Sequence, residues 1–327
     1  MDKKANILFT ATFSTPFIRE DISFLQEHFT VTPVISSGPL TFFRWFPAIL
    51  RSDISFSWFA SVYSSILVLK MKLLGRRSVI VLGGVDVARM PEFNYGVWNS
   101  RWRSVLVRFG IMNADIVLAV DESLKRDAMR LAGYDGKNIR VVPTGYDPAR
   151  WSPDGTKERR VLTVAHCDTV TRAKIKGIDF LADVALNMPE EKFLLIGIKN
   201  EIAVQFRLPK NVTVMDAVVQ DELLKQYRSA SVYFQPSRRE GLPSTLCEAM
   251  LCGCSPVGTD VGGIQHAIGA TGAVIPFGDV EKATETILNA LSSDAKTGSR
   301  ERIAEHFTKQ QREERLLDTI RALSDAE

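Results

Sequence analysis

Cysteine is scarce in this chain and absent from its first half. There are four, Cys167, Cys247, Cys252 and Cys254, which is not the pattern of a disulfide-stapled secreted domain. A zinc site would need four ligands, and the histidine nearest to these cysteines, His266, has no companion. We therefore expect four buried, reduced thiols.

Long hydrophobic runs are also missing. The uncharged stretch from Ile54 to Leu69 has sixteen residues, five of them serine, and is too short and too polar to span a bilayer. At the N-terminus, Met1-Asp2-Lys3-Lys4 is followed by an apolar segment at 5–9 and then by charges at 19–21, with no small-residue cleavage site. This order predicts a first strand rather than a signal peptide.

Composition places the chain among ordinary globular proteins. Of 327 residues, 45% are hydrophobic and 24% are charged, and this length favours two domains of roughly 150 residues each. Residues 1–150 carry 19 Lys or Arg against 13 Asp or Glu, a net charge of +6, whereas 151–327 carry 22 against 25, a net charge of −3. The first half would face an acidic or membranous partner, or simply has an ordinary solvated surface.

Short β-branched runs alternate with segments of helical period, which predicts an α/β fold with parallel sheets. In the first half we expect six strands, at Asn6–Thr12, Thr30–Ile35, Ile54–Trp58, Ser78–Leu82, Ile116–Ala119 and Ile139–Val142. The second half has five more, at Arg160–Val164, Phe193–Gly197, Val212–Val214, Ala230–Phe234 and Cys254–Val257. Two doubly wound sheets facing an interdomain cleft are therefore predicted.

Turn formers between the two series, from Pro143 to Asp154, mark an interdomain linker. We expect an N-terminal acceptor-side domain at 1–150, a donor-binding domain at 151–305 and a charged amphipathic C-terminal helix at 306–327.

Neither series opens with G-x-G-x-x-G: the first strand leads into Phe13-Ser14-Thr15-Pro16 and the second series into Ala165-His166-Cys167-Asp168. A dinucleotide-dependent oxidoreductase is thereby disfavoured. The chain also has no D-x-D, so we expect no bound metal and no cofactor.

The most informative segment runs from Pro236 to Met250 and reads PSRREGLPSTLCEAM. It follows a strand, contains Gly241, and starts a helix at about Pro243 or Ser244. Backbone N–H groups from Gly241 to Thr245, with the positive end of the helix dipole, suit a diphosphate. Gly253 is placed to end this helix.

Glu240 precedes the helix and Glu248 lies inside it, so that the two carboxylates would line one groove. Carboxylates accept hydrogen bonds from sugar and ribose hydroxyls. The alternative is an ordinary surface pair, because glutamate is common on helices.

Taken together, E-G-L-P-S-T-L-C-E-A-M resembles the donor-site signature of retaining family-4 glycosyltransferases of the GT-B fold. The resemblance extends over most of the second half: Val161–Val164 with Lys176-Gly177, the stretch Asn211–Ala230, the pair Gly262-Gly263, and Pro143–Asp147 as a variant of the interdomain P-N-G-x-D. It implies two Rossmann-like domains and a nucleotide-sugar donor.

The resemblance also assigns roles to residues. Glu240 would contact the transferred sugar and Glu248 the ribose, with Lys176 on the diphosphate and Arg172 as a second cation. The sugar and phosphates would meet Gly241, Leu242, Pro243, Ser244 and Thr245. This chain departs from the family at His166, where the usual arginine is missing, so Arg172 and Lys174 are alternatively a solvated basic loop.

The first half matches less closely. Many relatives have a histidine after the fourth strand, where this chain reads Gly83-Gly84-Val85-Asp86. With Pro91–Gly96 this resembles a G-G-x-D motif of a prokaryotic branch. Asp86 is the candidate acceptor-side catalytic acid, or else a turn-capping aspartate.

The function implied is a retaining hexosyltransferase in carbohydrate or cell-envelope biosynthesis. It would act in the cytoplasm on a glycan, lipid-linked or small-molecule acceptor, with no nucleic-acid partner. A GT-B epimerase or phosphorylase and a non-catalytic sugar-nucleotide-binding relative are the alternatives. Phe42–Phe46 and Arg101-Trp102-Arg103 would contact the cytoplasmic membrane face peripherally, or belong to the core.

Overall fold

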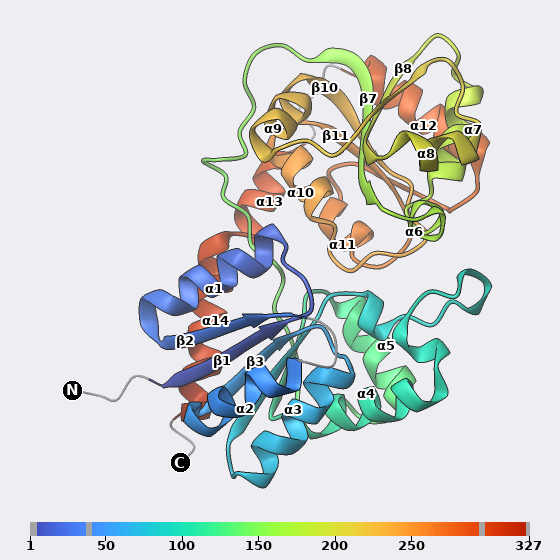
Figure 1. Cartoon of the computed structure of the whole chain (residues 1–327). Helices are drawn as coiled ribbons and strands as arrows, with labels where there is room; N and C mark the ends of the chain where they lie inside the picture. The colour runs from blue at the N-terminus through green and yellow to red at the C-terminus, as the bar shows by residue number, and fades with distance from the viewer. Residues whose placement is uncertain (1–4, 37–40, 294–297, 325–327) are drawn as a thin grey trace. The chain divides into compact units, whose positions relative to one another are not determined.

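A computed structural model describes residues 5–36, 41–293 and 298–324 (Figure 1). The chain divides into two compact units, Met1–Thr144 with Gln310–Glu327, and Gly145–Lys309. Each unit holds a six-stranded sheet. Within the predicted linker, the boundary between the units falls after Thr144.

The first unit is built on a parallel sheet of strand order β2-β1-β3-β4-β5-β6. The six predicted strands are confirmed within one residue at their ends, as β1 (Asn6–Ala11), β2 (Thr30–Ile35), β3 (Ile54–Trp58), β4 (Arg77–Leu82), β5 (Ile116–Ala119) and β6 (Ile139–Val141). Residues at the centre of this sheet are almost wholly buried, which explains why their sequences read as unbroken apolar runs.

Helices cover both faces of this sheet (Figure 1). They are α1 (Pro16–His28), α2 (Thr41–Arg51), α3 (Val62–Leu73), α4 (Arg101–Asn113), α5 (Glu122–Ala132) and α14 (Lys309–Ser324), with short 3₁₀ turns at Val85–Val87, Pro91–Phe93 and Val97–Asn99. On one face, Leu8 of β1 packs against Trp45 of α2 and Leu67 of α3. On the other, Trp58 Nε1 of β3 donates to Asp21 Oδ2 of α1 over 2.9 Å.

The last helix, α14, returns to the first unit and is held there by a buried ion pair. Arg312 donates to both carboxylate oxygens of Asp21 over 2.7 and 2.6 Å, and to the carbonyls of Val142 and Pro143 over 3.1 and 3.0 Å. Because the guanidinium is paired with a carboxylate and also donates to two carbonyls, its charge is tolerated in the interior. Among the described residues, the helix expected at 306–327 is seen as Lys309–Ser324, and it packs on α1 from the first part of the chain.

The second unit repeats the architecture with the order β12-β11-β10-β7-β8-β9, all parallel. Its strands are β7 (Glu158–Cys167), β8 (Lys192–Ile198), β9 (Val212–Met215), β10 (Ala230–Gln235), β11 (Ser255–Thr259) and β12 (Ala273–Ile275). The five predicted strands are confirmed. The sixth, β12, has three residues and was not predicted, because so short a segment shows no period.

The helices of the second unit lie between these strands in sequence or follow the last of them. They are α6 (Val170–Ile175), α7 (Ile178–Leu186), α8 (Asn200–Ala203) with a 3₁₀ turn at Val204–Phe206, α9 (Gln220–Ser229), α10 (Ser244–Leu251), α11 (Ile264–Ile268), α12 (Val280–Ser292) and α13 (Ser299–His306). In the part of the chain that the structure describes, none of the helices is both long enough and apolar enough to cross a membrane.

Candidate functional site

The candidate site lies in the second unit, where β10 ends and α10 begins. The predicted helix is confirmed at Ser244–Leu251, with Pro243 as its N-cap and Gly253 following at a φ of +79°. Within the described residues, the backbone N–H groups of Gly241, Leu242, Ser244 and Thr245 donate no hydrogen bond. They are therefore available, with the positive end of the helix dipole, to an anionic group.

Glu240 and Lys176 form an ion pair beside this helix start. Lys176 Nζ donates to Glu240 Oε1 over 2.6 Å, and the same oxygen accepts from Gln235 Nε2 at 3.1 Å and Ser237 Oγ at 2.7 Å. The Glu240 side chain is 9% exposed and that of Lys176 26%. The carboxylate is thus oriented by three donors, all of which meet Oε1.

A glycine brings Lys176 to this position. Lys176 is the C-cap of α6, and Gly177 follows with a φ of +73°, a conformation that favours glycine. A Cβ on Gly177 would overlap the carbonyl oxygen of Pro236. The backbone after α6 therefore touches the loop after β10 directly, and Arg238 N–H completes the contact by donating to Ile175 O over 2.8 Å.

Arg238 fastens the same two segments through its side chain. Its guanidinium donates to Asp179 Oδ1 and Oδ2 over 2.6 and 2.8 Å and to Lys174 O over 2.5 Å, and it lies 4.2 Å from the centroid of the Phe277 ring. No local pattern signals this role, since Arg238 reads as one of two adjacent surface cations. The structure makes it a positioning residue for the loop that carries Glu240.

The glycine pair Gly262-Gly263 supports the loop from its other side. A Cβ on Gly262 would overlap the Glu240 carbonyl oxygen, and Gly263 N–H donates to Gly241 O over 2.7 Å. The part of the family pattern that follows the donor signature is thus explained by packing. The neighbouring His266 is exposed and lies edge-on to Phe307, with ring centroids 5.3 Å apart.

Glu248 lies one turn into α10 and is held by a buried tyrosine. Tyr227 donates its hydroxyl to Glu248 Oε2 over 3.1 Å, and burial, reinforced by the nearby carboxylate, raises the pKa of Tyr227 well above its ordinary value. Thr245 is held in the same way, because the buried Tyr233 hydroxyl lies 2.8 Å from its Oγ1. Tyr227 belongs to the stretch Asn211–Ala230 that carries the family resemblance, but the sequence assigned a role to neither tyrosine.

Arg172, the second cation predicted at the donor site, is not part of the Lys176–Glu240 ion pair. It belongs to α6, and its NH1 lies 3.6 Å from Asp168 Oδ2. Burial raises the pKa of the Cys167 thiol to about 12, and the charges of Lys176 and Arg172 oppose that rise. Both cations therefore lie within electrostatic range of Cys167, although Arg172 makes no ion pair with Glu240.

Asp86 lies in the first unit, in the loop after β4, and is fully buried. Its carboxylate accepts backbone N–H groups from Ala60 at 3.0 Å, Gly83 at 3.1 Å and Gly84 at 2.7 Å. Burial raises its pKa, and these hydrogen bonds oppose the rise. The contacts are those of the turn-capping alternative.

The cysteines are free and buried, as predicted. Among the described residues, no three His, Cys, Asp or Glu side chains gather as they would around a metal ion. Trp45 of the predicted aromatic cluster is buried beside Tyr63, with ring centroids 5.8 Å apart. The side chains at 42–44 and 46 lie outside the described ones.

Comparison with known proteins adds a family match and structural neighbours. Residues 159–293 match the family described as glycosyl transferases group 1. N-acetyl-alpha-D-glucosaminyl L-malate synthase of Bacillus anthracis is 26% identical over 246 residues, which is 69% of this chain and 62% of that protein. The matched part thus spans less than two thirds of that relative.

Several solved structures resemble nearly the whole chain. Sucrose-phosphate synthase (tll1590) from Thermosynechococcus elongatus has a TM-score of 0.78 at 15% identity, covering 99% of this chain and 100% of its own. Anabaena Alr3699/HepE in complex with UDP-glucose has a TM-score of 0.74 at 14% identity, covering 97% and 100%. At these identities the likeness shows the fold.

Proposed function

We propose, for a chain that has the GT-B fold and carries a family-4 type glycosyl transferases group 1 domain at residues 159–293, the transfer of a sugar to an acceptor hydroxyl. The donor in this proposal is a nucleoside-diphosphate sugar, and the anomeric configuration is retained. Retention follows from the family resemblance of the donor-site signature.

One observation carries the proposal: the ion pair of Lys176 and Glu240 beside the unbonded N–H groups that open α10. Such a place offers one cation, a row of N–H donors and one oriented carboxylate. A nucleoside-diphosphate sugar presents the matching groups, since its diphosphate takes the cation and the N–H donors while its sugar hydroxyls donate to the carboxylate.

The chemistry is stabilisation of the leaving group. As the bond between the anomeric carbon and the diphosphate breaks, negative charge grows on the diphosphate oxygens. Lys176 at the C-cap of α6, and the N–H groups of Gly241, Leu242, Ser244 and Thr245 at the start of α10, would stabilise that charge. Glu240 would orient the sugar through its hydroxyls.

The remaining contacts with the nucleotide-sugar donor follow from the positions of residues along α10. Glu248, which is held by Tyr227, would accept hydrogen bonds from the ribose hydroxyls. It lies one turn further into the helix than the N–H groups assigned to the phosphates. Arg172 would serve as a second cation at the outer end of the diphosphate. No metal ion is needed in this scheme, since cationic side chains and the helix dipole supply the positive charge.

The neighbouring structures support this donor class. HepE was solved with UDP, with UDP and glucose, and with UDP-glucose. We infer a nucleotide-sugar donor for this chain as well, with a glycan, lipid-linked or small-molecule acceptor, and a cytoplasmic location where such donors are made.

The proposal is tested by thermal unfolding of the full chain with UDP-, GDP-, ADP- and dTDP-sugars. A ligand that binds only the folded state raises the midpoint temperature of unfolding. At a ligand concentration of one hundred times Kd, the free energy of unfolding increases by about 2.7 kcal/mol. We expect stabilisation by one nucleotide class, and donor turnover that accelerates when an acceptor is added. If none of the four nucleotide-sugar classes raises the midpoint temperature, the donor assignment is refuted. Binding without turnover would favour a non-catalytic relative.

A further inference from the structure

Helix α3 of the first unit presents a row of apolar side chains to solvent. Val62, Ile66, Leu69 and Leu73 are spaced by four, three and four residues and so share one face of the helix. Exposure increases along the row, because Val62 and Ile66 are half-buried while Leu73 is 76% exposed. The opposite face of the same helix fills the core through Leu67 and Met71. Packing within the unit therefore does not account for the outer row.

Helix α4 repeats the spacing with a different composition. Arg101, Val105, Arg108 and Met112 again follow the four-three-four pattern and are all exposed, Val105 by 67%. In the first turn of α4, Trp102 is 59% exposed, and the guanidinium carbon of Arg103 lies 5.4 Å from the centroid of the Trp102 ring. This face of α4 thus alternates cations with large apolar side chains.

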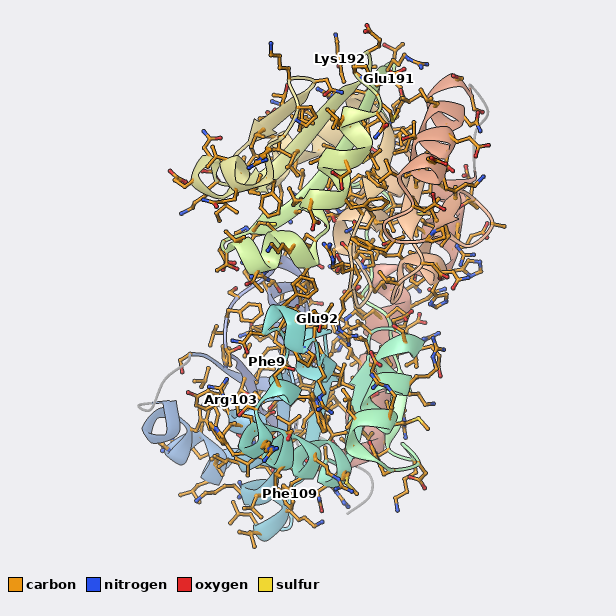
Figure 2. All side chains as sticks on the ribbon, turned by 90° about the vertical axis from the view of Figure 1, so that its right-hand side faces the viewer. Phe9, Glu92, Arg103, Phe109, Glu191 and Lys192 are labelled. Atoms are coloured by element: carbon orange, nitrogen blue, oxygen red, sulfur yellow. The ribbon has the colours of Figure 1, made fainter. Side chains whose placement is uncertain are left out.

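The two helices that carry these rows are neighbours and pack closely against each other. Gly110 of α4 lies so close to Ser65 of α3 that a Cβ would overlap the serine hydroxyl. Lys72 Nζ of α3 donates to Asn113 Oδ1 of α4 over 2.7 Å. Figure 1 shows α3 and α4 neighbouring on the same side of the sheet, and in Figure 2 Arg103 and Phe109 mark α4. We call their solvent-facing side the α3–α4 surface.

Charge on this part of the chain is strongly one-sided. Residues 54–113 contain two acids, Asp86 and Glu92, against eight cations, Lys70, Lys72, Arg76, Arg77, Arg89, Arg101, Arg103 and Arg108. Of these cations, Arg77 forms an ion pair with Asp115, which lies just beyond this range. Asp86 is buried. In the described parts of the chain, Arg101, Arg103 and Arg108 have no ion pair with an acidic side chain. Their charges are therefore directed at the solvent.

We propose that the α3–α4 surface binds the surface of an anionic lipid bilayer. Leu69, Leu73 and Val105 would enter the boundary between headgroups and acyl chains, with Trp102 at headgroup level and the arginines against lipid phosphates. This combination of apolar and cationic side chains selects the occupant. A second copy of the same surface would bring like charges together, and a nucleic acid would leave the apolar row in water.

Vesicle co-sedimentation of the full chain tests the proposal. We expect binding to vesicles of phosphatidylcholine mixed with phosphatidylglycerol, weaker binding to phosphatidylcholine alone, and weakening by salt, which screens the arginines. Two double variants test the surface, Leu73→Ser with Val105→Ser and Arg101→Gln with Arg108→Gln. Each should bind the anionic vesicles at least about tenfold more weakly, because each replaced side chain contributes a severalfold factor to the affinity.

The matched control is Val204→Ser with Val219→Ser, which removes two valines of the second unit that are 70% and 74% exposed. It should bind vesicles like the parent, and all variants should unfold at the parental temperature because the changed side chains lie outside the core. Equal binding of parent and surface variants, or no preference for anionic vesicles, would overturn the proposal. So would a parental dimer that the surface variants convert to monomers without any lipid binding.

The readout is lipid binding and requires neither donor nor acceptor. A negative result here therefore leaves the proposed transferase activity standing, and loss of that activity by a donor-site variant says nothing about the α3–α4 surface.

Discussion

Lys176 Nζ and Glu240 Oε1 lie 2.6 Å apart although 64 residues separate them in sequence. One follows α6 after the central strand β7, and the other lies in the loop after the neighbouring strand β10. Parallel strands bring their carboxyl ends to one edge of a sheet, where ligands of such folds bind. The pair is thus a consequence of topology, and each side chain neutralises the other in a half-buried setting.

Replacing Glu240 with glutamine tests the role of the carboxylate. The amide keeps the shape of the side chain and can still accept from Ser237 and Gln235, so that the fold should remain intact. We expect transfer to fall by roughly 100-fold or more, because an oriented charge at the reacting sugar is lost. Initial rates with purified protein and a melting curve check both parts. Parental turnover would remove Glu240 from the site.

Lys176→Ala should weaken the affinity for the nucleoside diphosphate as well as slow turnover. A hydrogen bond from a charged donor contributes about 1.5–3 kcal/mol, which corresponds to roughly a tenfold to hundredfold rise in the Kd measured by calorimetry. Lys174→Ala is the matched control, because Lys174 is exposed on the same helix two residues earlier. If both variants bind the diphosphate like the parent, Lys176 does not contact it.

The extent to which the sequence predicts this molecule differs between backbone and side chains. Eleven strands and the start of α10 follow from period and turn residues, which are local signals. The pairing of Arg238 with Asp179 spans 59 residues, and no local pattern encodes it. Arg312 shows the same limit, since its sequence neighbourhood indicates an amphipathic helix but not the buried Asp21 on which it packs.

Gly177→Ala should be costly and Gly155→Ala mild, although both glycines have nearly the same φ, +73° and +71°. A Cβ at Gly155 meets nothing within 4 Å, whereas one at Gly177 overlaps the Pro236 carbonyl. The left-handed conformation alone costs about 1–2 kcal/mol, and overpacking adds about 1–3 kcal/mol. Chemical denaturation of the two variants measures the difference, which isolates the packing contribution.

The same glycine pair also reports on the site. Because the clash pushes Lys176 away from the loop that carries Glu240, Gly177→Ala should lower turnover of the molecules that remain folded, whereas Gly155→Ala should not. Equal stability and equal turnover in the two variants would contradict the close approach of the loops.

The four thiols should not react with a thiol reagent in the native protein at pH 8, and they should react fully after denaturation. All four are buried, and burial raises the pKa of Cys167, Cys247 and Cys252 to about 12 from the ordinary 9.0. The reactive thiolate is therefore suppressed. Since these folded pKa values are raised, stability should decline as the pH increases from 9 toward 12. A rapid native reaction would contradict the burial.

Asp86→Asn distinguishes the two interpretations of that residue. In the structure the carboxylate accepts three backbone N–H groups, from Ala60, Gly83 and Gly84. An amide turns one acceptor into a donor that faces these N–H groups, and a buried unsatisfied group costs about 1–3 kcal/mol. We therefore expect lower stability of the variant at neutral pH, measured by urea denaturation, and unchanged turnover per folded molecule under saturating donor.

The pH dependence gives a second, independent check on Asp86. Its folded pKa is raised above 3.8 by burial, so the folded state binds this proton more tightly than the unfolded chain. The stability that the proton contributes is present at acid pH and is lost as the pH rises through the folded value. Asparagine does not titrate, and the stability difference between parent and variant should accordingly narrow as the pH rises above 4. An acceptor-side acid would behave differently: Asp86→Asn would then lower turnover at unchanged stability, and it would leave the affinity for the nucleoside diphosphate intact.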